Sequence, residues 1–222
     1  MFKAIILDMD GLMVDTERLY IRCNHEIARN RGKQVQPPTQ IRMIGRSPVE
    51  SLAIFAADLG LPDDPCELVA IRDQMMLDLV QTDLLAMPGL TELLSFARPR
   101  FRLAVATGSP RKLVDVVLDK LAIRPLFEWI QTAEGIPNGK PDPEIFLRAV
   151  TQLRLPPGES IVLEDSENGV RAGRSAGCYT IGVPNSDTRQ QSFAAAHFVA
   201  AHLHAAREHI AALTVSSSTS LS

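Results

Sequence analysis

The sequence has neither an excess of basic residues nor long runs of one charge. Its 222 residues include 23 lysines and arginines against 26 aspartates and glutamates, a formal net charge of −3, and no five like charges stand together. A protein that binds nucleic acid by neutralising phosphates normally has a basic excess or a basic stripe. The composition therefore indicates that nucleic acid is not a partner of this chain.

Cysteines and long apolar stretches are also scarce. The three cysteines, Cys23, Cys66 and Cys178, are odd in number and far apart, and no metal-binding spacing joins them. This usage is typical of reduced thiols in a cytosolic protein. No apolar stretch approaches the roughly 20 residues of a membrane-spanning helix, and the run Ala4–Leu7 is too short for the core of a signal peptide. We expect a soluble, cytoplasmic protein with no membrane partner.

What the sequence does have is a set of short apolar runs that stop abruptly at polar residues. Hydrophobic residues make up 45% of the chain and charged residues 22%, an ordinary globular composition. The runs are Ala4–Leu7, Leu103–Ala106, Ile161–Leu163 and a less regular fourth, Tyr179–Val183. Runs of this length without alternation suit strands buried on both faces, as in a parallel sheet covered by helices.

Helix signals separate these runs. Ser109-Pro110 predicts an N-cap followed by proline at the first helical position, and Asp142-Pro143 repeats the pattern. Pro156-Pro157-Gly158 then ends the second of these helices and returns the chain to a strand. This alternation predicts an α/β fold with a doubly wound, Rossmann-like parallel sheet as its core.

The stretch between Asp15 and about Met87 has helix signals and no convincing strand. One amphipathic helix has an apolar face formed by Leu19, Cys23 and Ile27. A capping box, Ser47-Pro48-Val49-Glu50, begins a second helix, and Gly60 suits its end. Asp64 begins a third, with one face formed by Leu68, Ile71, Met75 and Leu79.

These features predict an all-helical cap domain inserted after the first strand. We expect the catalytic core at residues 1–15 and 87–213, the cap at 16–86, and a disordered tail at 214–222, which is rich in serine and of low complexity. A chain of 222 residues has room for one sizeable core with such a smaller insertion.

In a doubly wound sheet, ligands bind beyond the carboxyl ends of the strands, so the residues that follow each run form the candidate site. These are Asp8, Asp10, Gly11, Thr107, Gly108, Ser109, Glu164 and Asp165, with Lys140 in a loop before a helix. Clustered carboxylates repel unless a cation or protons intervene, and oxygen ligands favour a hard ion such as Mg²⁺. Lysine, threonine and backbone N–H groups at a helix start would hold phosphate oxygens. The set predicts a site for Mg²⁺ and a phosphoryl group.

Asp8-x-Asp10-Gly11, Thr107, Lys140 and Glu164-Asp165, in this order, resemble the motifs of the haloacid dehalogenase-like (HAD) superfamily. The helical insertion is similar to the cap of its phosphatase and phosphomutase group, which includes phosphoglycolate phosphatase and β-phosphoglucomutase. The resemblance covers residues 1 to about 213. An isolated Asp-x-Asp is a weak signal, whereas all the motifs in order at strand ends, with a cap in place, are a strong one.

The resemblance implies a role for each matching residue. Asp8 would be the nucleophile that forms an aspartyl phosphate, and Asp10 would protonate the leaving alkoxide and then deprotonate the attacking water. Thr107 would hydrogen-bond a phosphoryl oxygen, while Lys140 would neutralise charge and orient Asp8. The Mg²⁺ ligands would be Asp8, Asp10 through its backbone carbonyl, Glu164 and Asp165.

Other positions keep open alternatives. We assign substrate contacts to Gly11, Gly108, Ser109 and Arg46, although Gly108 departs from the small polar residue usual after the threonine. Arg46 either presents its charge to an anionic substrate or is a solvated residue of the capping-box loop. Glu164 is either a direct ligand or a support behind the ligands. Asp15 either takes part in the chemistry or caps a helix and sets the hinge.

The expected function is a Mg²⁺-dependent phosphatase for a small phosphorylated metabolite, acting as a monomer with the cap closing over the leaving group. The alternative is a sugar phosphomutase similar to β-phosphoglucomutase. Such mutases use a cap histidine where this sequence has Tyr20, with His25 further along, so the phosphatase is favoured. Dehalogenation needs no metal, and the Glu164-Asp165 pair argues against it. A phospho-accepting receiver has its aspartate mid-chain and no such cap.

Overall fold

The structure is a computed structural model that describes residues 1–44 and 46–216. Within them the chain divides into two compact units. The core unit joins Met1–Val14 to the chain from Ala86 onward, and the cap unit is Asp15–Leu85. Of the expected tail, residues 214–216 belong to a helix and 217–222 lie outside the described residues. Among the described residues, no helix combines the length and the apolar character that crossing a membrane requires.

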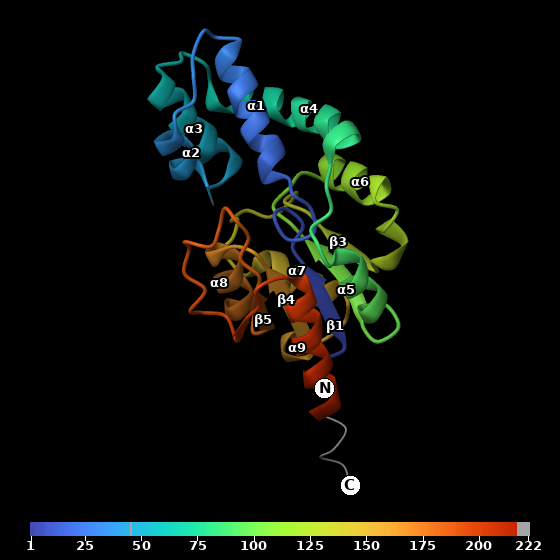
Figure 1. Cartoon of the computed structure of the whole chain (residues 1–222). Coiled ribbons are helices and arrows are strands. Elements are labelled where there is room, and N and C mark those ends of the chain that lie inside the picture. The colour runs from blue at the N-terminus through green and yellow to red at the C-terminus, as the bar shows by residue number, and fades with distance from the viewer. Residues whose placement is uncertain (45, 217–222) are drawn as a thin grey trace. The chain divides into compact units, whose positions relative to one another are not determined.

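The core unit is built on a parallel sheet (Figure 1), in which the strand order is β3-β2-β1-β4-β5-β6. The expected runs form β1 (Ala4–Leu7), β2 (Arg102–Ala106), β4 (Ser160–Glu164) and β5 (Tyr179–Gly182). β1 is central, because β2 and β4 pair with its two edges in registers that align Ile5 with Leu103 and with Ile161. The doubly wound, Rossmann-like fold is thereby confirmed.

Two edge strands were not expected from the sequence. β3 (Trp129–Gln131) pairs with β2, and β6 (Phe198–Val199) pairs with β5. They are three and two residues long, too short for an apolar run to stand out from the neighbouring loops.

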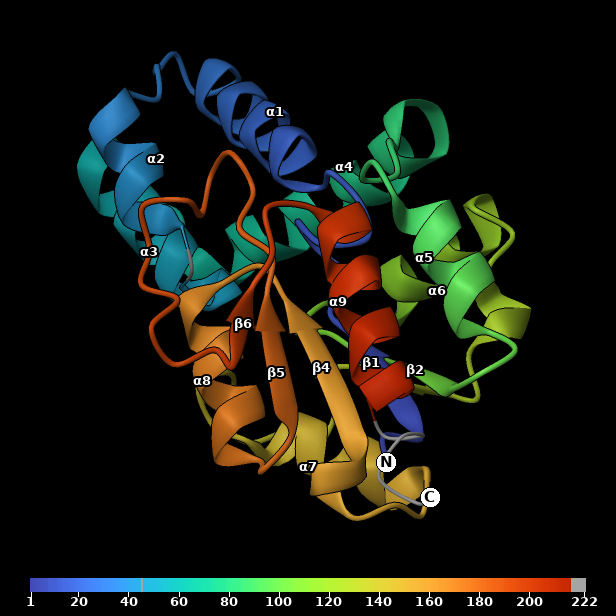
Figure 2. The same cartoon turned by 60° about the horizontal axis from the view of Figure 1, so that its bottom comes forward.

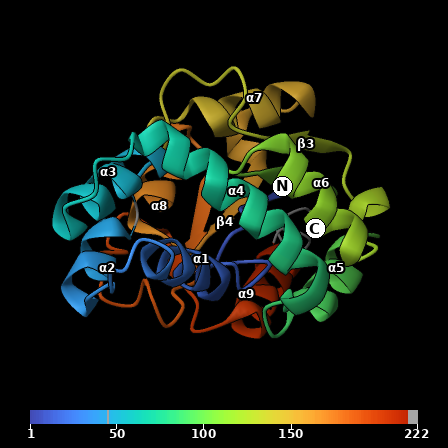
Figure 3. The same ribbon diagram turned by 90° about the horizontal axis from the view of Figure 1, so that it is seen from above.

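Helices cover both faces of this sheet, as Figures 2 and 3 show for the core unit. α7 (Glu144–Gln152) and α8 (Glu167–Ser175) pack on one face, where Phe146 joins a cluster with Ile6 and Val162. α5 (Leu90–Ala97) and α9 (Leu203–Ser216) lie against each other on the opposite face. α6 (Arg111–Lys120) lies in the connection between β2 and β3. Because both faces are covered, every residue of β1 and β4 is buried, which explains the unbroken apolar runs.

The cap unit consists of helices, with no strand among its described residues. They are α1 (Glu17–Arg29), α2 (Pro37–Met43), α3 (Pro48–Leu59) and α4 (Pro65–Asp83). The expected capping box is present, since Ser47 Oγ accepts from the Glu50 N–H at 3.3 Å and Glu50 accepts from the Ser47 N–H at 3.0 Å. α2 was not expected, because its seven residues are too few to establish a helical period.

The buried face of α4 differs from the expected one by one position. The helix buries Leu68 and Met76 together with Arg72, whereas Ile71 is 41% exposed. The guanidinium carbon of Arg72 lies 5.0 Å from the centre of the Tyr20 ring on α1. An arginine over an aromatic ring can be buried at low cost, and hydrophobic periodicity gives no sign of such a pair.

Candidate active site

Two neighbouring strands bring the acidic residues together. Asp8 directly follows β1, Glu164 ends β4 and Asp165 follows it, and the two strands are paired. These three residues are at most 7% exposed. From β1 the chain passes to β2 and β3 on one side and returns to β4 on the other. The carboxylates therefore lie at the point where the strand order reverses, which is where doubly wound sheets bind ligands.

Lys140 binds two of these carboxylates at once. Its Nζ donates to Asp8 Oδ1 at 2.5 Å, to Glu164 Oε1 at 2.6 Å and to the Ala106 carbonyl at 3.2 Å. An ammonium group has three hydrogens to donate, so each hydrogen of Lys140 is donated to an acceptor at the end of a different strand, β1, β4 or β2. Lys140 comes from the loop between β3 and α7, which thus reaches the same sheet edge.

The pKa values of this pair respond to burial and to the neighbouring charges. Burial raises the pKa of Asp8 to about 8; Lys140 opposes the shift, whereas the negative charges of Glu164 and Asp10 add to it. Burial by itself would lower the pKa of Lys140, but the charges of Asp8 and Glu164 outweigh burial and raise it above its usual value. Lys140 therefore stays an ammonium ion.

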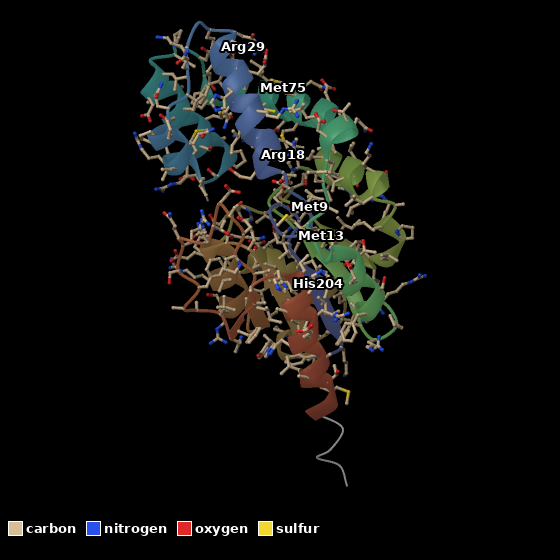
Figure 4. The ribbon with its side chains drawn as sticks, viewed as in Figure 1. Met9, Met13, Arg18, Arg29, Met75 and His204 are labelled. Carbon is tan, nitrogen blue, oxygen red and sulfur yellow. The ribbon has the colours of Figure 1, made fainter. Side chains whose placement is uncertain are left out.

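A buried turn holds Asp10 next to Asp8. The Gly11 N–H donates to the Val14 carbonyl and the Met13 N–H to the Met9 carbonyl, both at 2.9 Å. Met9 and Met13, labelled in Figure 4, are completely buried. Gly11 has a φ of +74°, a left-handed conformation that favours glycine. The turn therefore has a fixed shape anchored in the core unit.

The two hydroxyl groups that follow β2 both donate to Asp10. Thr107 Oγ1 lies 3.0 Å and Ser109 Oγ 2.7 Å from Asp10 Oδ2. The expectation that Ser109 caps α6 was wrong, since the helix begins at Arg111 and its N–H donates to Glu134 Oε1 at 2.6 Å. Because the Glu134 carboxylate accepts from the first N–H of α6, the Ser109 hydroxyl is available to Asp10.

Both oxygens of Glu164 are engaged within the protein. Oε1 accepts from Lys140, and Oε2 accepts from the Ser166 N–H at 3.1 Å and from the Ser166 hydroxyl at 2.9 Å. A Cβ at Gly169 would lie only 1.8 Å from Glu164 Cδ, so this conformation of Glu164 depends on the glycine. Here Glu164 supports Lys140, and its assignment as a metal ligand stays a prediction.

Asp165 is held by a residue that the sequence analysis missed. Asn185 Nδ2 donates to Asp165 Oδ2 at 2.8 Å and to the Gly11 carbonyl at 3.1 Å. Burial raises the pKa of Asp165 well above its usual value, and the charges of Glu164 and Asp8 raise it further. Asn185 comes shortly after β5, so extending the search for polar residues to the fourth apolar run would have found it.

The donor chemistry of the site fits Mg²⁺. Asp8, Asp10 and Asp165 offer only oxygen atoms. Burial, and to a smaller extent the neighbouring negative charges, raise the pKa values of Asp8 and Asp165, so a cation beside them would favour their ionised forms. Among the described residues, no three acidic, histidine or cysteine side chains gather into a ready-made metal site. Mg²⁺ is commonly held by one or two carboxylates completed by waters and substrate phosphate, which is consistent with this arrangement.

The remaining expected residues lie in different surroundings. Gly108 is exposed, and a Cβ there would meet open space among the described residues. Arg46 is an exposed residue of the cap unit, and its contact with substrate stays a prediction. Asp15 also belongs to the cap unit, where its Oδ1 accepts from the Arg18 N–H at 3.4 Å in the first turn of α1. That contact favours a capping role for Asp15.

Comparison with known proteins places the chain in a family. A model of the haloacid dehalogenase-like hydrolases matches residues 2–177. The phosphorylated carbohydrates phosphatase of Thermotoga maritima is 35% identical over 177 residues, which cover 79% of this chain and 82% of that protein. The fructose-1-phosphate phosphatase YqaB of Escherichia coli is 27% identical over 183 residues, covering 82% and 96%.

A solved structure has the same fold over most of its length. A variant of CbbY from Rhodobacter sphaeroides, in complex with xylulose-(1,5)bisphosphate, superposes with a TM-score of 0.83 and 26% identity, covering 91% of this chain and 95% of that one. The family match, the related phosphatases and the set of carboxylates, hydroxyls and lysine at one sheet edge agree. The chain belongs to the haloacid dehalogenase-like hydrolases and is a phosphoric monoester hydrolase.

Proposed function

We propose that the protein is a Mg²⁺-dependent phosphatase that hydrolyses a small phosphorylated sugar or polyol through an aspartyl phosphate on Asp8. The observation that carries the proposal is the arrangement of buried Asp8 with half-buried Lys140 and Asp10. One carboxylate is bound to a cation, and a second carboxylate beside it is held by two hydroxyl groups. This arrangement suits attack on a phosphoryl group by one carboxylate and proton transfer by the other.

In the first step Asp8 attacks the phosphorus atom and the bond from phosphorus to the ester oxygen breaks. Lys140 is bound to Asp8 Oδ1, so Oδ2 is the oxygen that attacks. The departing oxygen takes a proton from the Asp10 carboxyl group, which yields the free alcohol and an aspartyl phosphate.

In the second step water attacks the same phosphorus atom. Asp10, now a carboxylate, accepts the proton of the water, and the bond from Asp8 to phosphorus breaks. Inorganic phosphate leaves and the Asp8 carboxylate is restored. Thr107 and Ser109 keep Asp10 in place for both transfers, and Lys140 offsets the negative charge around Asp8. Positioning and charge stabilisation supply most of the catalysis in phosphoryl transfer.

The residues that would hold Mg²⁺ are Asp8 and Asp165, with the backbone carbonyl of Asp10. When bound, the ion supplies positive charge that favours the ionised form of Asp8 and balances the phosphoryl oxygens. Burial raises the pKa of Asp8 and so disfavours its ionised, nucleophilic form, and a cation beside it would offset that effect. The proposal therefore makes activity dependent on the metal.

The substrate class is inferred from the related proteins. Two of them are named as phosphatases of phosphorylated carbohydrates and of fructose 1-phosphate, and CbbY was crystallised with a pentulose bisphosphate. A phosphorylated sugar or polyol has the phosphoryl group that the core site handles and hydroxyl groups that further residues can recognise.

Phosphate release from a panel of esters tests the proposal. Fructose 1-phosphate and xylulose 1,5-bisphosphate would be compared with phosphoglycolate and a nucleoside monophosphate, each with Mg²⁺ and with a chelator. We expect faster release from the sugar phosphates and none after chelation. Asp8→Asn should lower turnover by several orders of magnitude, because an amide cannot accept the phosphoryl group as a carboxylate does.

The matched control is Asp119→Asn, which makes the same change at a side chain that is 63% exposed on α6. This variant should keep wild-type turnover. Near-wild-type turnover by Asp8→Asn would refute the proposal. Interconversion of sugar phosphates with little phosphate released would instead identify a phosphomutase.

A further inference from the structure

We propose that Asn185 is a positioning residue that holds Asp165 and the Gly11 carbonyl in place for Mg²⁺ binding. The inference rests on the proposed function, because it concerns the metal site of that reaction. Asn185 lies in the loop that follows β5, 20 residues after Asp165 and 174 residues after Gly11. No motif of the sequence analysis includes it.

Both hydrogens of the Asn185 side-chain amide are donated to residues of the candidate active site. Nδ2 donates to Asp165 Oδ2 at 2.8 Å and to the Gly11 carbonyl at 3.1 Å. Asp165 directly follows β4, and Gly11 belongs to the turn that carries Asp10. One amide group therefore joins the two segments whose oxygen atoms are the proposed metal ligands.

The other end of the side chain fixes the orientation of this amide. Asn185 Oδ1 accepts from the Asp187 N–H at 2.8 Å, from the Thr188 N–H at 3.0 Å and from the Thr188 hydroxyl at 3.2 Å. A reversed amide would point an oxygen at the oxygens of Asp165 and Gly11 and a nitrogen at these donors. Only the observed orientation satisfies all the partners.

Because both of its hydrogens are engaged, Asn185 has none left for substrate. An amide group whose two hydrogens and acceptor oxygen are all bound within the protein acts on its partners and not on a ligand. Its effect on Asp165 is to bind Oδ2. Oδ1 has no hydrogen-bond partner among the described residues and is the oxygen available to a cation.

The packing around Gly11 leaves this arrangement little freedom. A Cβ at Gly11 would lie 2.3 Å from Asp165 Oδ2 and 2.7 Å from Asn185 Nδ2. The backbone of the turn thus comes close to both side chains, and a side chain at position 11 would displace them. Residues that orient metal ligands from behind typically contribute about tenfold to a hundredfold in metal affinity.

Direct metal binding to the full chain without substrate tests the inference. The probe is Mn²⁺, which takes the same oxygen ligands as Mg²⁺ and whose free form is counted by electron paramagnetic resonance. Asn185→Ala should raise the dissociation constant for Mn²⁺ by about tenfold. Thr188→Val removes one bond that orients the amide and also the acceptor of the Asn185 backbone N–H, but the Thr188 and Asp187 N–H groups still hold Asn185 Oδ1, so it should raise the constant less. Turnover of Asn185→Ala should recover towards wild type at high Mg²⁺, with KM for the substrate little changed.

The matched control is Ser186→Ala in the same loop. Ser186 is exposed, and among the described residues its hydroxyl hydrogen-bonds only to the neighbouring Asp187, so Mn²⁺ affinity should not change. If the wild type binds Mn²⁺ and Asn185→Ala binds it equally well, Asn185 only anchors its loop and the inference is wrong. If Asn185→Ala does not fold, an unchanged affinity in Thr188→Val overturns the inference. If the wild type binds no Mn²⁺, the proposed function itself fails.

Discussion

A single ammonium group, that of Lys140, connects the ends of three strands. Burying a charge costs several kcal/mol unless hydrogen bonds and an opposite charge compensate it. Lys140 meets both conditions through Asp8 and Glu164, and those two carboxylates depend on it in turn. The contact that orients Asp8 in the proposed mechanism therefore also stabilises the folded core.

Lys140→Ala should lower the free energy of unfolding by about 3 kcal/mol, because two buried carboxylates would lose their cation. Phosphate release should fall at the same time. Burial raises the pKa of Asp8 to about 8 although the charge of Lys140 opposes the shift, so the pKa should rise further in the variant. A carboxyl group whose pKa is raised in the folded state destabilises that state as the pH rises above about 4, so the variant should lose more stability than the wild type as the pH rises from about 4 towards 8. Denaturant unfolding over this pH range measures both effects.

The control for this variant is Lys3→Ala. Lys3 forms an ion pair with Glu159, but its side chain is 56% exposed. An exposed pair contributes between 0 and about 1 kcal/mol, so this change should be small at every pH. Equal losses in the two variants would contradict the account of Lys140.

At the scale of elements, the connection from β4 to α8 determines the position of Glu164. Ser166 begins α8 as its N-cap and also donates to Glu164, and the Gly169 N–H donates to the Ser166 hydroxyl. The first turn of α8 therefore lies directly against the Glu164 carboxylate. Position 169 requires glycine because the helix backbone there lies close to the Glu164 side chain, not because of the backbone conformation of Gly169.

Gly169→Ala should destabilise the protein by about 2 kcal/mol through overpacking against Glu164. This direction is opposite to the usual one, because replacing glycine by alanine inside a helix normally stabilises a protein by about 1 kcal/mol. Gly158→Ala is the matched control, because a Cβ there meets open space among the described residues. Thermal unfolding should show a lower melting temperature for Gly169→Ala and little change for Gly158→Ala. A more stable Gly169→Ala would contradict the close contact.

The strands that carry the site were predictable because each is an unbroken apolar run buried on both faces. Asp8, Thr107 and Asp165 could then be found as the polar residues that follow those runs. Short elements such as β3, and the shifted face of α4, could not be predicted, since neither length nor periodicity marks them. Ser109 was assigned a cap that Glu134 supplies, because sequence spacing does not reveal contacts between distant loops. Asn185 was missed for a different reason, because the fourth apolar run, Tyr179–Val183, was not followed to the polar residue beyond it.

At the scale of the whole molecule, the fold collects a site from distant parts of the chain. Asp8 is close to the start of the sequence, whereas its partners Lys140 and Asp165 come more than 130 residues later. The parallel sheet brings them together, because the carboxyl ends of its strands lie at one edge. The central claim is that Asp8, at this edge, accepts the phosphoryl group from the substrate.

Trapping the intermediate tests this claim most directly. The enzyme would be mixed with fructose 1-phosphate and Mg²⁺, quenched in acid, and treated with borohydride, which reduces an aspartyl phosphate to homoserine. Peptide mass spectrometry then locates the altered residue. We expect homoserine at position 8, only in samples that received substrate. Unaltered Asp8 in protein that still releases phosphate, or reduction at a different residue, would contradict the account.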